Sequence, residues 1–261
     1  MPAISIKNLT VRFGLRVLAV DDFSLDINEG DFVSIVGPSG CGKTTVLNQL
    51  TGLLPPQEGS ISILGKSPHE GNSDLAYMLA RDCLLPWRTT LSNARYGMQI
   101  RGVPKAEAEA QARELMAQVG LKGFEDNYPK ALSHGMRQRC ALARTFGLKS
   151  PILLMDEPFG ALDAQTKLTL EDLLLQLWQE HRRTVVFITH DLAEAVALSD
   201  RVIVMSARPG RIVADVPIPL ARPRSVRELQ KSPEFHEIYT HVWEQLERGI
   251  QLSGEPAQTV E

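Results

Sequence analysis

The chain has 261 residues, of which 43% are hydrophobic, and a formal net charge of -3 at pH 7. This length and apolar content allow one large domain or a domain with a substantial insert. The charge argues against nucleic acid as the ligand, because nucleic-acid-binding domains usually carry a basic face or a high pI. The three cysteines show neither a CxxC pair nor metal-ligand spacing, so no disulfide framework or zinc site is expected.

The termini and the hydropathy pattern bear on location. The N-terminus lacks a basic segment followed by an apolar run, and no stretch approaches the roughly 18 apolar residues of a membrane span. We therefore expect a protein that is neither exported nor membrane-spanning by itself.

Two kinds of strand pattern are visible. Residues 4–13 (ISIKNLTVRF) and 23–27 (FSLDI) alternate apolar and polar side chains, as half-buried antiparallel strands do. Residues 32–36, 152–155 and 184–189 are nearly continuous apolar runs, which are typical of central strands in a parallel sheet. Helical patterns follow the first two of these runs. The alternation predicts an α/β fold with a mainly parallel sheet.

The middle of the chain, from about residue 86 to 150, has a different character. It contains no convincing strand, and PKAEAEAQARELMAQVG (104–120) reads as a helix with proline near its start and glycine at its end. We predict a helical insert in this region.

The C-terminal part begins with a proline-rich segment, PIPLARPR (217–224), which cannot be a central strand or a helix. We predict that it is a linker separating a main domain, 1–216, from a tail, 217–261. In the tail, Ser232 is a predicted N-cap before Pro233, and an apolar stripe follows along the helix. This stripe packs on the core or, as the alternative, binds a partner.

A phosphate-binding motif follows the first apolar run. GPSGCGKTT (37–45) matches G-x-x-x-x-G-K-[ST] and precedes a helical pattern. The glycines allow backbone N–H groups to surround a phosphate, Lys43 reaches the terminal phosphates, and the Thr44 hydroxyl can bind Mg²⁺. The alternative is a glycine-rich turn without nucleotide. The predicted nucleotide-binding residues here are Gly37, Pro38, Ser39, Gly40, Cys41, Gly42, Lys43, Thr44 and Thr45.

Two further apolar runs end in polar residues. ILLMDEP places Asp156 and Glu157 at a strand end, where carboxylates are costly to desolvate unless they serve a cation or a proton. Asp156 is the predicted Mg²⁺ ligand and Glu157 the predicted general base for an attacking water. TVVFITH ends in His190, which could contact a γ-phosphate and position the base. Solvated acids in a turn and a structural histidine are the alternatives.

The stretch LSHGMRQRCALAR (132–144) is a polar loop that runs into a helix. Ser133 is a good N-cap, so the helix start offers free N–H groups and a favourable dipole for an anion. We predict a second phosphate site, which could complete the nucleotide site of a second copy of the protein. The alternative is an ordinary capped surface helix.

Taken in order, GPSGCGKTT, LSHGMRQR, ILLMDEP, GALD and ITHD closely resemble the phosphate loop, signature, magnesium and base motif, D-loop and switch histidine of ABC transporter ATPases. The resemblance covers most of the chain. It implies a P-loop NTPase core with a mainly parallel sheet, an N-terminal antiparallel β subdomain and a helical insert carrying the signature. It also implies ATP hydrolysis with ATP and Mg²⁺ as cofactors.

In that family, two subunits enclose two ATP molecules, each bound by the phosphate loop of one and the signature of the other. By position, Phe13 resembles the residue that stacks on adenine. Ser133 and Gly135 resemble the γ-phosphate contacts made in trans, and Asp163 the dimer-crossing aspartate.

Within the family, LLPWRTTLSNA, MSARPGRI and KSPEFHEIYTHVW resemble the nitrate, sulfonate, taurine and bicarbonate importer group. Membership implies uptake of a small anion with three partners: a second copy, an integral-membrane permease dimer, and a periplasmic or lipid-anchored substrate-binding protein. It also implies a peripheral position on the cytoplasmic face of the inner (plasma) membrane. Residues from about 80 to 95 would receive the permease near Trp87, or Leu84, Leu85 and Trp87 would merely pack the insert on the core.

Two residues depart from the family pattern. Ala80 stands where the family has a glutamine that bridges Mg²⁺, attacking water and permease, and His134 stands at the first glycine of the signature. Ala80 favours an alternative function, a nucleotide-binding subunit with weak hydrolysis in a regulatory or heteromeric role. A member acting on DNA or ribosomes is disfavoured because no basic surface or coiled-coil insert is visible.

Overall fold

The computed structural model of the chain describes residues 2–14 and 17–251. They form two compact units, one from the described residues up to 72 and from 182 onward, and the other from residues 73–181. The predicted helical insert, about 86–150, falls inside the second unit. The predicted division after residue 216 stays a prediction.

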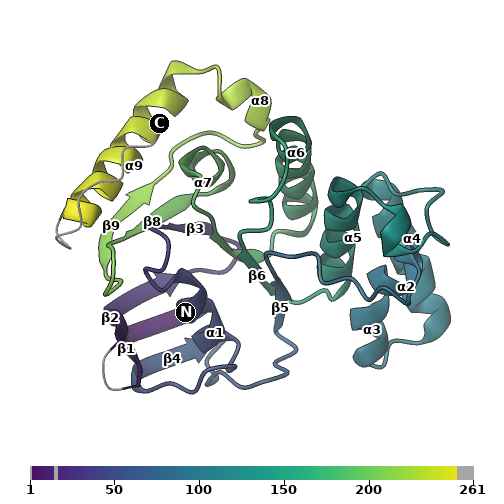
Figure 1. Cartoon of the computed structure of the whole chain (residues 1–261), viewed down its shortest axis with the longest axis horizontal. Coiled ribbons are helices and arrows are strands. Elements are labelled where there is room, and N and C mark those ends of the chain that lie inside the picture. Colours follow the sequence, from purple (N-terminus) through teal and green to yellow (C-terminus); the bar gives the residue numbers. More distant parts are fainter. Residues whose placement is uncertain (1, 15–16, 252–261) are drawn as a thin grey trace. The chain divides into compact units, whose positions relative to one another are not determined.

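The first unit contains a three-stranded sheet in the order β2-β1-β4 (Figure 1). Its strands are β1 (Ile4–Phe13), β2 (Val17–Ile27) and β4 (Glu58–Ile63). Both partners run antiparallel to β1, and Ile4 faces Ile27 on one side and Ile63 on the other. These three isoleucines are buried, so the predicted alternation places one apolar face on the core. The predicted N-terminal antiparallel β subdomain is confirmed.

The same unit contains the parallel strands that carry the phosphate-binding motif. In it, β3 pairs with β7 and β8 in parallel, and β9 pairs with β8 antiparallel. Every residue of β3 and β7 is buried, as the continuous apolar runs predict for central strands. The elements are β3 (Phe32–Val36), α1 (Lys43–Leu50), β7 (Thr184–Ile188), α7 (Leu192–Leu198), β8 (Arg201–Met205) and β9 (Ile212–Pro217).

The C-terminal residues form α8 (Val226–Leu229) and α9 (Pro233–Gln251), and α9 packs on α7, β8 and β9 (Figure 1). The predicted N-cap is confirmed, because the Ser232 hydroxyl accepts from the Phe235 N–H at 3.2 Å. Phe235 and Val242 are buried in this packing, whereas Trp243 stays 39% exposed. The centre of the stripe therefore packs on the core, and its edge remains accessible.

The proline-rich segment before these helices has no helix or strand after Pro217, yet it is held tightly. Ile218 and Leu220 are buried. The guanidinium of Arg224 is also buried, and it donates to main-chain carbonyls at the end of α7 and within the segment itself. A spacer predicted from prolines is thus a packed part of the first unit.

The second unit pairs β5 (Leu75–Met78) with β6 (Ile152–Asp156) in parallel. Helices α2 to α5 pack on one another in the insert, grouped together in Figure 1. The predicted helix within 104–120 is present as α4. None of the described helices is long and apolar enough to cross a membrane. The helices are α2 (Thr90–Ala94), α3 (Tyr96–Ile100), α4 (Lys105–Gln118), α5 (His134–Gly147) and α6 (Ala164–His181).

The three thiols differ in environment, which yields a test of the packing. Cys41 and Cys140 are buried and Cys83 is exposed. Burial raises the pKa of Cys41, and it raises that of Cys140 from its ordinary 9.0 to about 12. The unfolded chain therefore ionises Cys140 first, so its contribution to stability is full below about pH 9 and is lost as pH rises toward 12.

We expect a thiol reagent such as dithionitrobenzoate to label only Cys83 in the native protein, up to about pH 9, because buried protonated thiols are inert. All three cysteines should react in urea. A Cys83→Ser variant provides the control and should show no labelling when folded. Rapid labelling of a second site in that variant would contradict the burial of Cys41 and Cys140.

Candidate active site

The phosphate loop connects β3 to α1, and its glycines are required by close packing. A Cβ on Gly37 would lie 3.0 Å from both Cys41 Sγ and the Met205 carbonyl oxygen. Gly42 has φ +107°, and a Cβ there would lie 2.8 Å from Val20 Cγ2. A left-handed backbone and the lack of space both exclude larger residues at this position. The loop can therefore adopt this tight curve only with glycine at positions 37 and 42.

The end of the loop carries the groups that are predicted to bind phosphate. The N-cap of α1 is Gly42, which has no side chain with which to cap the helix start, and a helix N-terminus of this kind suits an anion. Lys43 is buried, and its Nζ donates to the Gly37 carbonyl at 2.7 Å and to the Pro38 carbonyl at 3.1 Å. These bonds hold positive charge against the start of the loop. Ser39 and Thr44 are exposed beside it.

His190 and the phosphate loop leave the sheet at the same edge. Strands β3 and β7 are parallel, and Ile35 pairs with Ile188. His190 itself is exposed, while the backbone after it is fixed by Asp191, which accepts from the N–H groups of Ala193 and Glu194. The first unit thus brings together the loop and the predicted switch histidine.

Phe13 ends β1 in the same unit, where it pairs with Val17 of β2. Its ring is 44% exposed, so a face of the aromatic side chain is open to stacking. Its role at the adenine stays a prediction.

Asp156 and Glu157 lie at the end of β6 in the second unit. Asp156 is buried, and the Tyr77 hydroxyl donates to its Oδ2 at 3.4 Å. Burial and the neighbouring Asp156 raise the pKa of Tyr77, so the phenol stays protonated as a donor. Glu157 has φ +45°, a conformation that non-glycine residues rarely adopt and that is found at functional turns. Nothing in the sequence pattern indicated the role of Tyr77.

The signature helix supports the turn after β6. Gln138, on α5, donates from Nε2 to the Pro158 carbonyl at 2.9 Å. The predicted N-cap of α5 is confirmed, because Ser133 Oγ accepts from the Met136 N–H at 3.2 Å. The turn that carries Glu157 and the helix that begins after Ser133 therefore belong to one hydrogen-bonded structure within this unit.

Gly135 and Asp163 both lie next to Thr166, near the start of α6. A Cβ on Gly135 would lie 2.7 Å from Thr166 Cγ2, so α5 and α6 approach closely only with glycine there. Asp163 Oδ1 accepts from the Thr166 N–H at 3.0 Å, and hydrogen bonds from Thr166 lower the pKa of Asp163. The second unit thus gathers Ser133, Gly135 and Asp163, the three residues predicted to act across a dimer.

The two departures from the family pattern line one groove. Strands β5 and β6 are parallel with Met78 opposite Met155, so the segment holding Ala80 leaves the sheet at the same edge as Asp156. Ala80 is exposed and lines a groove of about 470 Å³ together with His134. The groove is lined by Ala80, Arg81, Asp82, Cys83, His134, Arg137 and Ala161.

The wall of this groove is pinned to α5. Arg137 Nε forms an ion pair with Asp82 at 3.0 Å. Arg144 donates to the carbonyls of Asp82 at 2.6 Å and Cys83 at 2.8 Å. Farther along, Leu84 is buried whereas Trp87 is 71% exposed, so Trp87 does not serve to pack the insert.

Comparisons with known proteins agree with this geometry. The ABC transporter family matches residues 20–160. A putative ATP-binding protein of Brucella abortus is 46% identical over 93% of this chain and 92% of its own length. The taurine import ATP-binding protein TauB of Rhizobium johnstonii is 41% identical over 87% of this chain and 88% of its own length.

A solved structure shows the same architecture. It is a dimeric ATP-binding cassette in a post-hydrolysis state, bound to ADP and Pi. It is 30% identical, with a TM-score of 0.71 over 84% of this chain and all of that one. The chain belongs to the ABC transporter family and is an ATP-binding cassette ATPase.

Proposed function

We propose that this ATPase energises the uptake of a small anion, such as nitrate, a sulfonate or taurine, through a membrane permease. The observation that carries the proposal is the likeness to taurine import ATP-binding proteins over about nine tenths of both chains. A second such relative, from Jannaschia, is 39% identical over 91% of each chain. The motifs that resemble the importer group lie at residues 84–94, 205–212 and 231–243, and they support the same assignment.

The site residues have roles that follow from their chemistry. The loop from Gly37 to Thr45 would bind the phosphates of ATP through N–H groups and Lys43. The hydroxyl of Thr44 and the carboxylate of Asp156 are the oxygen donors that Mg²⁺ prefers, and they would hold it. Bound Mg²⁺ would neutralise charge on the phosphates. Glu157 would accept the proton of the attacking water, and His190 would contact the γ-phosphate and position the base.

A second copy would complete each site. Ser133 caps α5, and Gly135 and Asp163 lie beside it, so this surface offers N–H groups to a γ-phosphate bound by the other copy. The dimeric state of the solved relative with ADP and Pi supports this arrangement.

The proposed membrane partners are an integral-membrane permease dimer and a periplasmic or lipid-anchored substrate-binding protein. The chain would bind the permease on the cytoplasmic face of the inner membrane, through residues 80–95. The strongly exposed Trp87 supports this placement, since a large apolar side chain that is mostly exposed suits a partner surface.

Uptake in cells tests this function. Cells expressing the chain with its permease and binding protein should accumulate a labelled anion, with taurine, alkanesulfonate and nitrate tested in turn. Lys43→Ala should abolish this uptake, and an exposed control, Lys122→Ala, should not. If Lys43→Ala cells still accumulated all three anions as the parent cells do, the importer assignment would be rejected.

A second candidate function rests on Ala80. Alanine has no polar group to offer to Mg²⁺, water or permease, and its groove is open to solvent. The chain would then bind nucleotide with weak hydrolysis in a regulatory or heteromeric complex.

Restoring glutamine distinguishes the two candidates. We expect the parent chain to hydrolyse ATP at a rate that rises with protein concentration, because two copies complete each site. Ala80→Gln should raise kcat severalfold by adding a polar group at the edge of the sheet that carries Asp156. Ala131→Gln, on an exposed turn, is the control. A negligible parent rate with intact ATP binding, rescued by Ala80→Gln, would instead support the heteromeric function.

A further inference from the structure

The turn between β8 and β9, residues 206–211, lies directly behind the phosphate loop. The Gly210 N–H donates to the Ala19 carbonyl at 2.9 Å, and the Gly210 carbonyl accepts from the Asp21 N–H at 3.1 Å. A Cβ on Gly210 would lie only 2.0 Å from the Cys41 carbonyl oxygen. The backbone of the turn therefore touches the backbone of the loop, with no room for a side chain between them.

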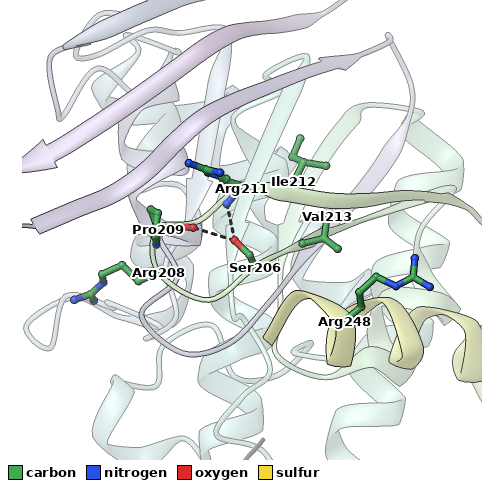
Figure 2. A pocket seen from close by; sticks show the side chains of 7 residues that line it. All are labelled: Ser206, Arg208, Pro209, Arg211, Ile212, Val213 and Arg248. Atoms are coloured by element: carbon green, nitrogen blue, oxygen red, sulfur yellow. Dashed lines mark hydrogen bonds between the residues drawn. The ribbon is translucent and has the colours of Figure 1, made fainter. Parts of the chain in front are cut away.

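This turn is held from several sides. Ser206 Oγ donates to the Pro209 carbonyl at 2.9 Å and accepts from the Arg211 N–H at 3.0 Å, as Figure 2 shows. The guanidinium of Arg211 pairs with Asp21 on β2. From α9, Gly249 packs closely, since a Cβ there would lie 3.4 Å from Ser206 Cα. These contacts fix the backbone of the turn, from which the side chain of Arg208 extends.

Arg208 extends from this support to the loop. Its Nε and Nη2 both donate to the Gly40 carbonyl oxygen, at 3.3 and 3.1 Å. Two N–H groups of a cation on one carbonyl form a charge-assisted contact, which is stronger than a neutral hydrogen bond. The side chain of Arg208 is otherwise exposed, so the contact with Gly40 is not a by-product of core packing.

A cavity of about 570 Å³ beside the turn is lined by three arginines, Arg208, Arg211 and Arg248. Their guanidinium groups do not converge: Arg208 and Arg211 point away from Arg248 in Figure 2. Arg208 is engaged with Gly40 and Arg211 with Asp21. We therefore relate the charge of Arg208 to the loop and not to a ligand in the cavity.

The bond to Gly40 sets the direction of one peptide group. In a trans peptide, the C=O and N–H groups point in opposite directions. With the Gly40 carbonyl held toward Arg208, the Cys41 N–H points into the loop, where it reaches the Pro38 carbonyl at 3.3 Å. Gly40 has φ +73°, and glycine tolerates many other orientations, so Arg208 adds a second restraint to the one that the bond with Pro38 provides.

We propose that Arg208 is a positioning residue of the nucleotide site. Through the Gly40 carbonyl, it holds the Gly40–Cys41 peptide with its N–H directed into the phosphate loop. This role rests on the proposed binding of nucleotide phosphates by the loop. It predicts that Arg208 contributes to phosphate affinity without touching the nucleotide.

Calorimetric titration of the full chain with MgADP tests the proposal. We expect Arg208→Ala to weaken binding by about tenfold, the effect of a single charge-assisted hydrogen bond. Arg248→Ala is a matched control, because it removes the same charge from the same cavity, whereas Arg248 donates to Gln245 on its own helix, α9. Its Kd should stay within about twofold of the parent. Arg208→Lys, which can still donate one bond, should recover part of the affinity.

Further measurements separate positioning from other roles. The Tm of Arg208→Ala should stay close to that of Arg248→Ala. In the Glu157→Gln background, Arg208→Ala should weaken the binding of ADP and of ATP by the same factor. Equal weakening in both arginine variants, unchanged ADP binding in Arg208→Ala, or a loss that grows from ADP to ATP would overturn the proposal. A parent chain that binds no ADP would reject the role of the loop itself.

Discussion

Replacing Glu157 with glutamine is expected to lower kcat for ATP hydrolysis by about 100-fold or more, because a general base contributes 10²–10⁴ in rate. Glutamine keeps the size of the side chain but cannot accept the proton of the attacking water. The turn itself should persist, since Gln138 holds it through the Pro158 carbonyl. ATP binding should therefore remain within a few-fold of the parent.

Steady-state phosphate release with MgATP, measured across protein concentration, checks this prediction. Glu114→Gln is the control, because Glu114 is exposed on α4 in the same unit and the charge change is identical. It should leave kcat unchanged. Hydrolysis that survives in Glu157→Gln would show that another group accepts the proton.

Replacing Arg224 with methionine is expected to destabilise the protein by about 3–5 kcal/mol, the range for removing one partner from a buried charged network. The side chain is only 1% exposed. It donates to the carbonyls of Ser199 and Leu220, each at 2.7 Å, and more weakly to those of Ala197 and Ile218. Methionine would fill the space but leave these buried carbonyls without a donor.

Burial lowers the pKa of Arg224 to about 10, with a further contribution from Arg222, so the guanidinium is still charged at neutral pH. Urea unfolding at pH 7 measures the effect, with Arg227→Met as the control because Arg227 is exposed on α8. The control should change stability by less than about 0.5 kcal/mol. A similar small change in Arg224→Met would mean that the segment after Pro217 contributes little to the fold.

The chemistry of the site was accessible from the sequence because each motif combines residue type, spacing and context. The run FVSIV followed by glycines and Lys43 could be assigned to a strand, a phosphate loop and a helix start, and the structure has these elements in this order. Ser133 could be recognised as an N-cap from its position before a helical pattern. These inferences depend on neighbours along the chain, for which local rules hold.

Contacts between distant segments could not be predicted in this way. Tyr77 reaches Asp156 across 79 positions, and Arg208 reaches Gly40 across 168. No spacing rule relates such pairs, since only strand order and register bring them together. The same limit applies to PIPLARPR, where the prolines suggested a spacer and the buried Arg224 was not foreseen.

The sequence by itself thus determined the class of protein and its fold class, with a mainly parallel sheet, N-terminal antiparallel strands and a helical insert, and it predicts the residues that bind and cleave ATP. These properties follow from local periodicity and from motifs a few residues long. Only the tertiary structure showed which residues contact them: Tyr77 at Asp156, Gln138 at the turn after β6, and Arg208 at Gly40. Their positions depend on the packing of segments far apart in the chain, which side-chain patterns along one segment do not encode.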